Sequence, residues 1–453
     1  MNSPLTPAST QVPRATAGER SSSPVPAPGT AAPLLPEEAP AASRNRFARL
    51  PLLAGRAFLP LGLFARLPLA MLTVGTLTLV TSASGSYALG GMAAGAVGIG
   101  SALGAPVLGA LADRRGQRPV LLLAALLNSI AVVALILAVG GTAESPGIPA
   151  AVLAAAFLSG ASCPQVGPLA RVRWMALAAR GPGKDQARDL DTALSYESTA
   201  DEVTFVLGPA LVGILASLLA PWLPLAVAVA LTITLVPAFA VHRTHRAVPA
   251  SRPARGNQVP AGSRVRAGKL PAAVAVPVLA MVCMGTFFGS TQTALSSFSA
   301  GFAGSETAGL LYAVMGLSSA VAALSVAYWP QRFGPARRWV LCAALMAALS
   351  LLLLLPTSMP SMVAALLILG LPVGPVMVTV FAVGGTIAPA GRLSTVMTAL
   401  ASGIVAGTAL GSSLGGQLAE SQGYAAAFLV PVCAASTLAL LGAGAAVVLR
   451  RKA

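Results

Sequence analysis

Charged side chains are scarce in this 453-residue chain: they make up 9% of its residues, whereas 56% are hydrophobic. A soluble globular domain carries about 25% charged residues. With so few polar groups the chain cannot cover a surface that faces water, and the composition therefore excludes an ordinary soluble protein. Lipid must be the main solvent of this chain.

Cysteine and histidine are also rare. The four cysteines fall in separate apolar segments, without the spacing of a metal site or a disulfide framework, at Cys163, Cys283, Cys342 and Cys433. His242 and His245 have no acidic cluster beside them, so a zinc site or a histidine-based catalytic triad has little to build from. A glycine-rich phosphate loop is absent from the sequence as well. We therefore expect no enzymatic activity, no cofactor, no metal and no ATP-driven pump within this chain.

Long apolar runs are abundant instead. A helix that crosses a bilayer needs about 20 apolar residues, and runs of this length recur from residue 59 onward. The sequence predicts an all-α membrane protein with twelve transmembrane helices. They are expected near residues 59–84, 87–112, 118–140, 148–170, 194–219, 221–242, 271–297, 305–329, 338–356, 360–388, 392–418 and 425–449.

Two polar segments divide the chain. Residues 1–46 are rich in proline, alanine and serine, which predicts a disordered cytoplasmic tail. Residues 243–270 form a basic loop that contains proline and glycine and separates the twelve spans six and six. We therefore expect an N-terminal six-helix lobe over residues 47–242 and a C-terminal six-helix lobe over residues 271–453.

The chain has a net charge of +16, and its basic residues fall on one side of the predicted membrane. If the N-terminus is cytoplasmic, all 29 lysines and arginines fall in the tails, on cytoplasmic connections or near cytoplasmic helix ends. The opposite connections carry only Glu144, Glu306 and Glu420. This positive-inside pattern predicts a multi-pass protein of the plasma (inner) membrane with both termini in the cytoplasm. It also argues against nucleic acid as a partner.

The two halves of the chain resemble each other weakly. A shift of 218 residues sets ADRRGQ against PQRFGP at 330–335, with Asp113 opposite Gln331. A shift of 203 residues aligns LGPALVG with LGSSLGG at 410–416. These matches fall on the second and eighth helices and on the fifth and eleventh, which indicates two lobes in parallel repeat.

The segment GALADRRGQRPVL, residues 109–121, resembles the signature of the loop between the second and third helices in the major facilitator superfamily. With the twelve spans and the degenerate second copy, the resemblance covers about residues 59–449. It implies a latch between the lobes that stabilises the outward-facing state. The latch residues are Gly109, Asp113, Arg114, Gly116 and Arg118. The alternative is that these charges only determine the topology.

The partner of this latch should be the eleventh helix. Glycines recur there at four-residue spacing, at Gly403, Gly407, Gly411 and Gly415. The second helix offers a similar set, at Gly91, Gly95, Gly100 and Gly104. Small residues let two helix backbones come close. They suit either sliding between the lobes or packing inside one lobe, and the sequence leaves both open.

The fifth helix contains FVLGPALVG, which resembles a reduced form of a motif found in antiporters and drug exporters. Gly208, Pro209 and Gly213 match that motif, whereas Thr204 and Val212 replace two of its glycines. The resemblance favours efflux. The alternative is a simple kink at the Gly-Pro pair.

Three carboxylates precede that motif, at Glu197, Asp201 and Glu202. Carboxylates at membrane depth are costly and are usually functional. One hypothesis is a structural charge cluster beside the latch, in which they pair with Arg114, Arg171 or Arg173. The other is proton coupling, for which Asp201 is the better candidate.

Arg66 raises a similar choice in the first helix. If this helix begins near Phe58, Arg66 lies about 12 Å along it and must face the bundle or a wet cavity. If the helix begins at Pro68, Arg66 only flanks the membrane. The apolar run before Arg66 favours the first arrangement.

The resemblance also implies a central cavity lined by the first, fourth, seventh and tenth helices. The candidate lining residues are Thr73, Gln165, Phe287, Gln292 and Met377. For each of them the alternative is ordinary helix packing. We identify no charged residue in the middle of these four helices, which favours a hydrophobic or amphipathic solute over a fixed dianion.

Together these features predict a monomeric secondary transporter that works by alternating access. Its expected partners are a small-molecule substrate, protons and the lipid bilayer, and proton-coupled efflux is the first expectation. A nutrient or metabolite importer on the same fold is the alternative. A non-transporting membrane receptor or scaffold is a third hypothesis.

The charge distribution makes the topology testable. In a cysteine-accessibility scan, a cysteine introduced near Gly256 should react with an impermeant reagent only from the cytoplasm, and one near Glu144 only from outside. Labelling of both positions from the same side would contradict the twelve-span topology.

Overall fold

The computed structural model describes residues 46–141, 150–181, 183–248, 272–302 and 307–450. Across these ranges all regular structure is helical, and twelve segments are long and apolar enough to cross a membrane. This confirms the predicted all-α fold with twelve spans in two six-helix lobes. The expected tail, most of the loop over 243–270, and the sequence positions Glu144, Gly256 and Glu306 lie outside the described residues.

The N-terminal lobe contains the first six spans. They are α2 (Phe58–Phe64) with α3 (Leu67–Ser84), α4 (Tyr87–Arg115), α5 (Gln117–Gly140), α6 (Ala150–Ala161) with α7 (Val166–Ala178), α8 (Gly183–Leu218) and α9 (Leu223–Val241). The C-terminal lobe contains the other six. They are α10 (Ala272–Ala300), α11 (Ala308–Ser325), α12 (Pro335–Ser350), α13 (Met359–Ile387), α14 (Leu393–Gln422) and α16 (Leu429–Arg450).

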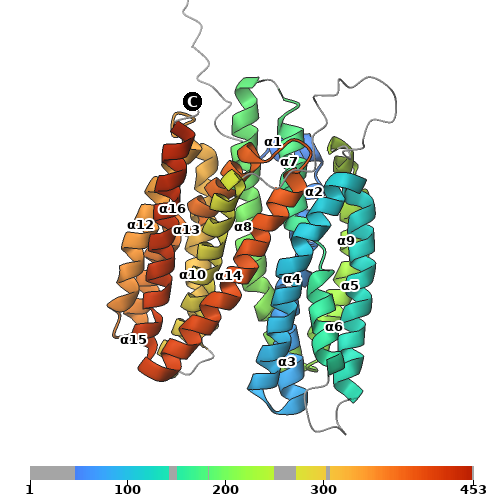
Figure 1. The fold of residues 1–453 in the computed structure, drawn as a ribbon, viewed down its shortest axis with the longest axis vertical. Coiled ribbons are helices and arrows are strands. Elements are labelled where there is room, and N and C mark those ends of the chain that lie inside the picture. The colour runs from blue at the N-terminus through green and yellow to red at the C-terminus, as the bar shows by residue number, and fades with distance from the viewer. Residues whose placement is uncertain (1–45, 142–149, 182, 249–271, 303–306, 451–453) are drawn as a thin grey trace, which may run out of the picture. The chain divides into compact units, whose positions relative to one another are not determined.

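Short helices precede, extend or connect these spans. They are α1 (Arg49–Ala54), η3 (Arg243–Ala247), η5 (Val326–Tyr328), η6 (Leu351–Leu354) and α15 (Tyr424–Ala427). We call the end of the bundle where α4 ends and α5 begins the basic end, because Arg114, Arg115 and Arg118 lie there. Figure 1 shows α14 running obliquely toward α4. The first turn of α14 meets α4 at the basic end.

Two spans are interrupted, and both interruptions position the candidate site. The first span is divided before Pro68, which occupies the first turn of α3, where a missing N–H costs little. Arg66 lies at this junction, as the N-cap residue of α3. The fourth span is divided at 162–165, which includes Pro164 and ends at Gln165, the N-cap residue of α7.

The fifth span is longer than predicted. It was expected over 194–219, whereas α8 begins at Gly183 and has 36 residues, so that it is about 54 Å long. A hydropathy criterion stops where charge begins, and the segment KDQARDLD before residue 192 is polar although it is helical. The extension carries Asp185, Asp189 and Asp191 beyond the predicted membrane boundary.

The glycine faces pack within the lobes. A Cβ atom on Gly407 would lie 2.0 Å from the carbonyl oxygen of Val282, so α14 packs here against the backbone of α10. A Cβ atom on Gly104 of α4 would lie 2.0 Å from the carbonyl oxygen of Ala161, at the end of α6. Of the two interpretations left open by the sequence, close packing inside a lobe accounts for the four glycines of α14 and for Gly100 and Gly104, whereas no atom lies within 4 Å of the Cβ positions of Gly91 and Gly95.

Each lobe also has its own apolar core. Buried side chains of the N-terminal lobe form two large clusters, one around Trp174 and Phe239 and one around Leu135 and Leu225. In the C-terminal lobe a single large cluster surrounds Trp339, and Val172 of α7 joins it from the other lobe. A smaller cluster joins Leu194 of α8 to Ala323, Val326 and Val378, so apolar packing also crosses between the lobes.

Two glycines of α14 provide a matched test of this packing. Gly407→Ala should lower the free energy of unfolding by about 1–3 kcal/mol, because the added methyl group overlaps the α10 backbone. Gly416→Ala should be neutral or slightly stabilising, because no atom lies within 4 Å of its Cβ position and alanine favours helix. Thermal unfolding of the purified variants measures both effects, and equal destabilisation would refute the assignment.

Candidate functional site

Asp113 connects the two lobes at the basic end. Its Oδ1 accepts a hydrogen bond from the Ser394 amide at 2.9 Å, and its Oδ2 accepts from the Thr395 amide at 2.8 Å and from Thr395 Oγ1 at 2.6 Å. These are free amides of the first turn of α14, whose own N-cap residue, Arg392, supplies no side-chain cap. Asp113 thus caps α14 from the other lobe and places a negative charge at the positive end of its dipole.

Two glycines let α4 and α14 come this close. A Cβ atom on Gly109 would lie 2.0 Å from Thr398 Oγ1, so only glycine fits between the helices here. Gly116 has φ +89°, a backbone conformation that ends α4 and starts α5 at once. The predicted latch residues Arg114 and Arg118 lie on the same connection, but both are exposed to the surface.

A second contact between the lobes involves Asp191 in the extension of α8. Its Oδ2 accepts from Arg338 Nη1 and Nη2 of α12, both at 3.1 Å, and from Gln331 Nε2 at 3.1 Å. Gln331 is the residue that the repeat sets opposite Asp113. The second copy has therefore lost its carboxylate, and the N-terminal lobe supplies one through Asp191.

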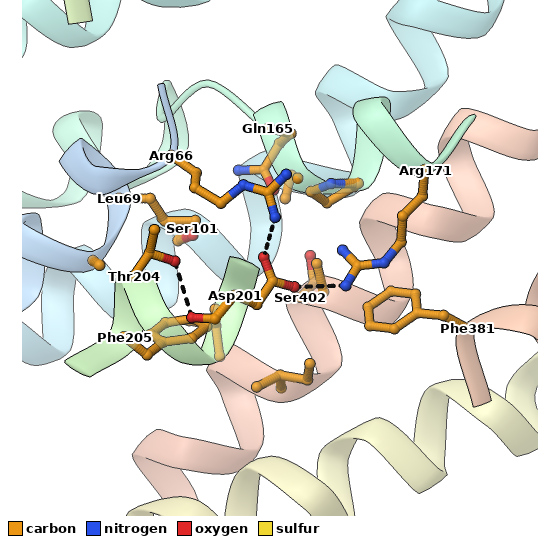
Figure 2. Close-up of a pocket in the computed structure, with 17 residues that line it drawn as sticks. Arg66, Leu69, Ser101, Gln165, Arg171, Asp201, Thr204, Phe205, Phe381 and Ser402 are labelled. Carbon is orange, nitrogen blue, oxygen red and sulfur yellow. Dashed lines mark hydrogen bonds and ion pairs between the residues drawn. The ribbon is translucent and has the colours of Figure 1, made fainter. Parts of the chain in front are cut away.

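A buried group of charges lies between α3, α7 and α8 (Figure 2). Arg66 Nη2 contacts Glu197 Oε2 at 2.5 Å, and Arg66 Nη1 contacts Asp201 Oδ1 at 2.7 Å. Arg171 Nη2 contacts the other oxygen of Asp201 at 2.6 Å. Trp174 donates its indole N–H to Glu197 Oε1 at 2.8 Å. The exposed fraction is 4% for Arg66 and 1% for Arg171 and Glu197, so these charges depend on one another rather than on water.

This arrangement decides several alternatives that the sequence left open. The first span begins at Phe58, and Arg66 is buried in the bundle rather than interfacial. Of the three arginines suggested as partners for the carboxylates, only Arg171 makes such an ion pair among the described residues. Arg173 donates instead to Gln117 Oε1, to the Phe239 carbonyl and to Thr244 Oγ1.

Glu202 points toward the other lobe. Its Oε1 accepts a hydrogen bond from Ser319 Oγ of α11 at 2.8 Å, and its exposed fraction is 8%. One turn earlier, Thr199 donates to the carbonyl oxygen of Ala320 at 3.1 Å. Glu202 and Asp201 are thus neighbours in sequence with different partners, a hydroxyl group for the first and two guanidinium groups for the second.

A small cavity of about 50 Å³ lies beside Asp201, between the two lobes (Figure 2). The guanidinium carbon of Arg171 lies 3.9 Å from the centre of the Phe381 ring of α13, a cation–π contact across the cavity. The other lining residues are Arg66, Leu69, Ala70, Ser101, Ala105, Gln165, Gly167, Pro168, Thr204, Phe205, Ala401, Ser402, Ile404 and Val405.

The predicted cavity residues have different locations. Gln165 lines this cavity, whereas Phe287 and Met377 are buried in the core of the C-terminal lobe. Thr73 and Gln292 are exposed and do not line it. Arg66 and Arg171 also line the cavity and are buried, so the cavity contains two cations although no charge was expected in the middle of these helices. The sequence favoured a buried Arg66, but it did not place Arg171 at the cavity.

Of the motif in the fifth span, packing accounts for Gly208. A Cβ atom on Gly208 would lie 2.6 Å from the Cβ atom of Ala70, so the glycine lets α8 approach α3. Pro209 lies inside α8, and no atom lies within 4 Å of the Cβ position of Gly213. Thr204 occupies one of the missing glycine positions, and its hydroxyl group donates to the backbone oxygens of Ala200 and Asp201.

Comparison with known proteins identifies the family. A family model described as the Major Facilitator Superfamily matches residues 58–399 and 278–453, which together cover most of the chain. The chain belongs to the major facilitator superfamily. It is therefore a multi-pass membrane protein of a transporter family and not an enzyme. A search of curated proteins gave no match.

Several solved structures of transporters share the fold of this superfamily member. The human organic anion transporter MFSD10 is 20% identical, with a TM-score of 0.63 over 85% of this chain and 98% of that one. A bacterial homologue of the iron transporter ferroportin, in the outward-facing state, is 14% identical, with a TM-score of 0.63 over 86% and 98%. The E. coli fucose:proton symporter is 14% identical, with a TM-score of 0.57 over 86% and 99%.

Three residues of this site were not found from the sequence: Asp191, Ser319 and Ser402. Asp191 lies outside the predicted fifth span, and the other two are on the C-terminal lobe, where they face charged residues of the N-terminal lobe. Only Ser402 had a local signal, since it directly precedes the glycine face of α14. The relation of these residues to the charges depends on how the lobes meet, which no local pattern encodes.

Removal of the charge on Asp113 should weaken the contact between α4 and α14. We expect Asp113→Asn to shift the equilibrium toward separation of the lobes at the basic end by about 2 kcal/mol, or about 30-fold, because a charged acceptor at a helix N-terminus is lost. Distances between spin labels at these ends of α4 and α14 measure the shift. Ser394→Ala is the matched control, because Asp113 binds the Ser394 amide and the Ser394 hydroxyl group has no partner. An unchanged distance distribution in Asp113→Asn would contradict the latch.

Proposed function

We propose that this chain is a secondary active transporter that couples the movement of protons to that of a small amphipathic solute. The observation that supports this proposal best is the position of Asp201, which is bound by two buried arginines and also lines the cavity between the lobes. A charged group that solute and protons can both reach is what coupling requires.

The contacts between the lobes support alternating access. Among the described residues, hydrogen bonds between the lobes lie in the half of the bundle toward the basic end, and they involve the side chains of Arg46, Asp113, Asp191, Thr199 and Glu202. We take the basic end as cytoplasmic, because of the positive-inside rule. On this assignment the structure is closed toward the cytoplasm, and transport requires these bonds to break.

We take Asp201 as the proton carrier because, of the three carboxylates, it alone lines the cavity. Glu197 is enclosed by Arg66 and Trp174 and does not line the cavity, which suits a structural role. Asp201 lines the cavity, so a proton can reach it from there. Protonation would release the guanidinium group of Arg171, which links the proton to a change in the binding site.

Two directions of transport remain as candidates. Efflux in exchange for protons is the first, on the resemblance of FVLGPALVG to the motif of antiporters and drug exporters. Import together with protons is the second. It is favoured by the pair of Asp201 with Arg171, because a proton on Asp201 frees a cation that an anionic solute can use.

We further propose that the chain acts as a monomer in the plasma (inner) membrane, with both termini in the cytoplasm. The cavity is lined by residues of both lobes, and both lobes belong to one chain. A second copy is therefore not needed to form the site.

Two amide substitutions separate coupling from structure. Asp201→Asn should abolish accumulation driven by a pH gradient but preserve exchange of solute down its own gradient, because the amide cannot bind and release a proton at this pH. Glu197→Gln should mainly reduce stability, by about 3–5 kcal/mol, because it leaves Arg66 short of a buried partner.

Proteoliposomes with an imposed pH gradient measure the first effect, with a panel of radiolabelled anionic, cationic and neutral amphipathic solutes. Thermal unfolding measures the second. If Asp201→Asn still concentrates a solute against its gradient, Asp201 is not the proton carrier. If no solute of the panel moves with protons in the unaltered protein, the proposed coupling fails.

A further inference from the structure

We propose that the cavity binds a small amphipathic monoanion, whose negatively charged oxygen is held by Arg171 and Ser402 and whose apolar part lies against Phe381 and Phe205. This inference rests on the proposed transport function and adds the class of solute. It narrows the expected hydrophobic or amphipathic solute to one with a single negative charge, because two arginines line the cavity.

The first observation is a pair of unused hydrogen-bond donors. Nε of Arg171 and Oγ of Ser402 have no hydrogen-bond partner among the described residues, and both residues line the cavity. Their exposed fractions are 1% and 7%, so bulk water does not satisfy them. A buried donor without an acceptor is costly. Two such donors from different lobes, α7 and α14, call for an acceptor atom between them.

The second observation is the balance of charge. Arg66 and Glu197 pair with each other, whereas Arg171 has one anionic partner, Asp201. If Asp201 takes up a proton, Arg171 becomes a buried cation without a counter-ion. One negative charge restores neutrality there. A second negative charge would be left unpaired in a poorly hydrated site, and a cation would be repelled by the unpaired guanidinium group of Arg171, so the geometry favours a monoanion.

The third observation is the apolar remainder of the lining. Phe205 and Phe381 face the cavity together with aliphatic side chains of α3 and α14, such as Leu69 and Ile404 (Figure 2). A volume of about 50 Å³ has room for only a few water-sized groups. It therefore accommodates a charged head group in this state, and a larger apolar part requires the lobes to separate.

The proposed exchange conserves charge. A proton from water adds to Asp201 Oδ2, the hydrogen bond from Arg171 Nη2 to that oxygen breaks, and an oxygen of the anion accepts from Arg171 in its place. One proton and one negative charge enter the site together. Besides Arg171, the charged and titratable groups that surround Asp201 are Arg66, Tyr196, Glu197 and Glu202. Of these, Arg66 retains its ion pair with Glu197 throughout.

Benzoate and benzamide test the charge requirement, because they have the same shape and differ in charge. The full-length protein in detergent should bind benzoate at least about tenfold more tightly than benzamide. Benzoate binding should strengthen as the pH falls toward about 5.5, because binding takes up a proton while benzoate itself stays ionised. Isothermal titration calorimetry in buffers of different ionisation enthalpy measures both the affinity and the proton uptake.

Three variants assign the effect to residues. Arg171→Lys keeps the positive charge and removes Nε and the planar fork, so it should weaken benzoate binding at least about tenfold. Ser402→Ala should weaken it about threefold to tenfold. Ser198→Ala is the matched control and should not change it, because its hydroxyl group is also buried without a partner but does not line the cavity. Asp201→Asn should bind benzoate without pH dependence.

The outcomes are distinct. Equal binding of benzoate and benzamide, no binding of benzoate, or full benzoate affinity in Arg171→Lys would each overturn the anion site. Proton uptake that persists in Asp201→Asn would overturn the role of Asp201 in it. Selective benzoate binding without any proton-coupled flux in proteoliposomes would uphold the anion site and refute the proposed transport function. Proton-coupled flux of another solute, without benzoate binding, would uphold the proposed transport function and refute the anion site.

Discussion

Arg66 and Arg171 lie inside a bundle whose surroundings are apolar, and each needs a carboxylate within contact distance. Breaking a buried ion pair leaves a stranded charge, which costs far more than an intact exposed pair contributes. Glu197 and Asp201 meet this need from one face of α8. The interruption at Pro68, the break before α7 and the close approach of Gly208 to α3 all serve to bring these four side chains together.

The helix α8 also connects the buried charges to the contacts between the lobes. Asp191 pairs with Arg338 near the basic end, Asp201 lines the cavity, and Glu202 accepts from Ser319 of the other lobe. From Asp191 to Glu202 the helix rises only about 16 Å. Asp201 therefore lies on the same continuous helix as two of the contacts between the lobes.

The two contacts at the basic end differ in chemistry although they arise from equivalent positions of a repeat. In the first, Asp113 caps the free amides of α14, a contact that only glycine at position 109 allows. In the second, Gln331 replaces the carboxylate, and Asp191 supplies it from the opposite lobe to Arg338. Both negative charges thus come from the N-terminal lobe.

The sequence by itself determined the twelve spans, the two lobes and the superfamily, because apolar length, glycine and proline positions, and the segment 109–121 are local properties. It also predicted that Arg66 faces the bundle and that Asp201 is the better candidate for proton coupling. Only the tertiary structure decided which arginine pairs with Asp201, that the glycine face of α14 packs within its own lobe, and that Ser402 and Phe381 lie opposite Arg171. These facts depend on the relative position of helices far apart in the chain, which is set by the sum of many packing contacts rather than by any short pattern of residues.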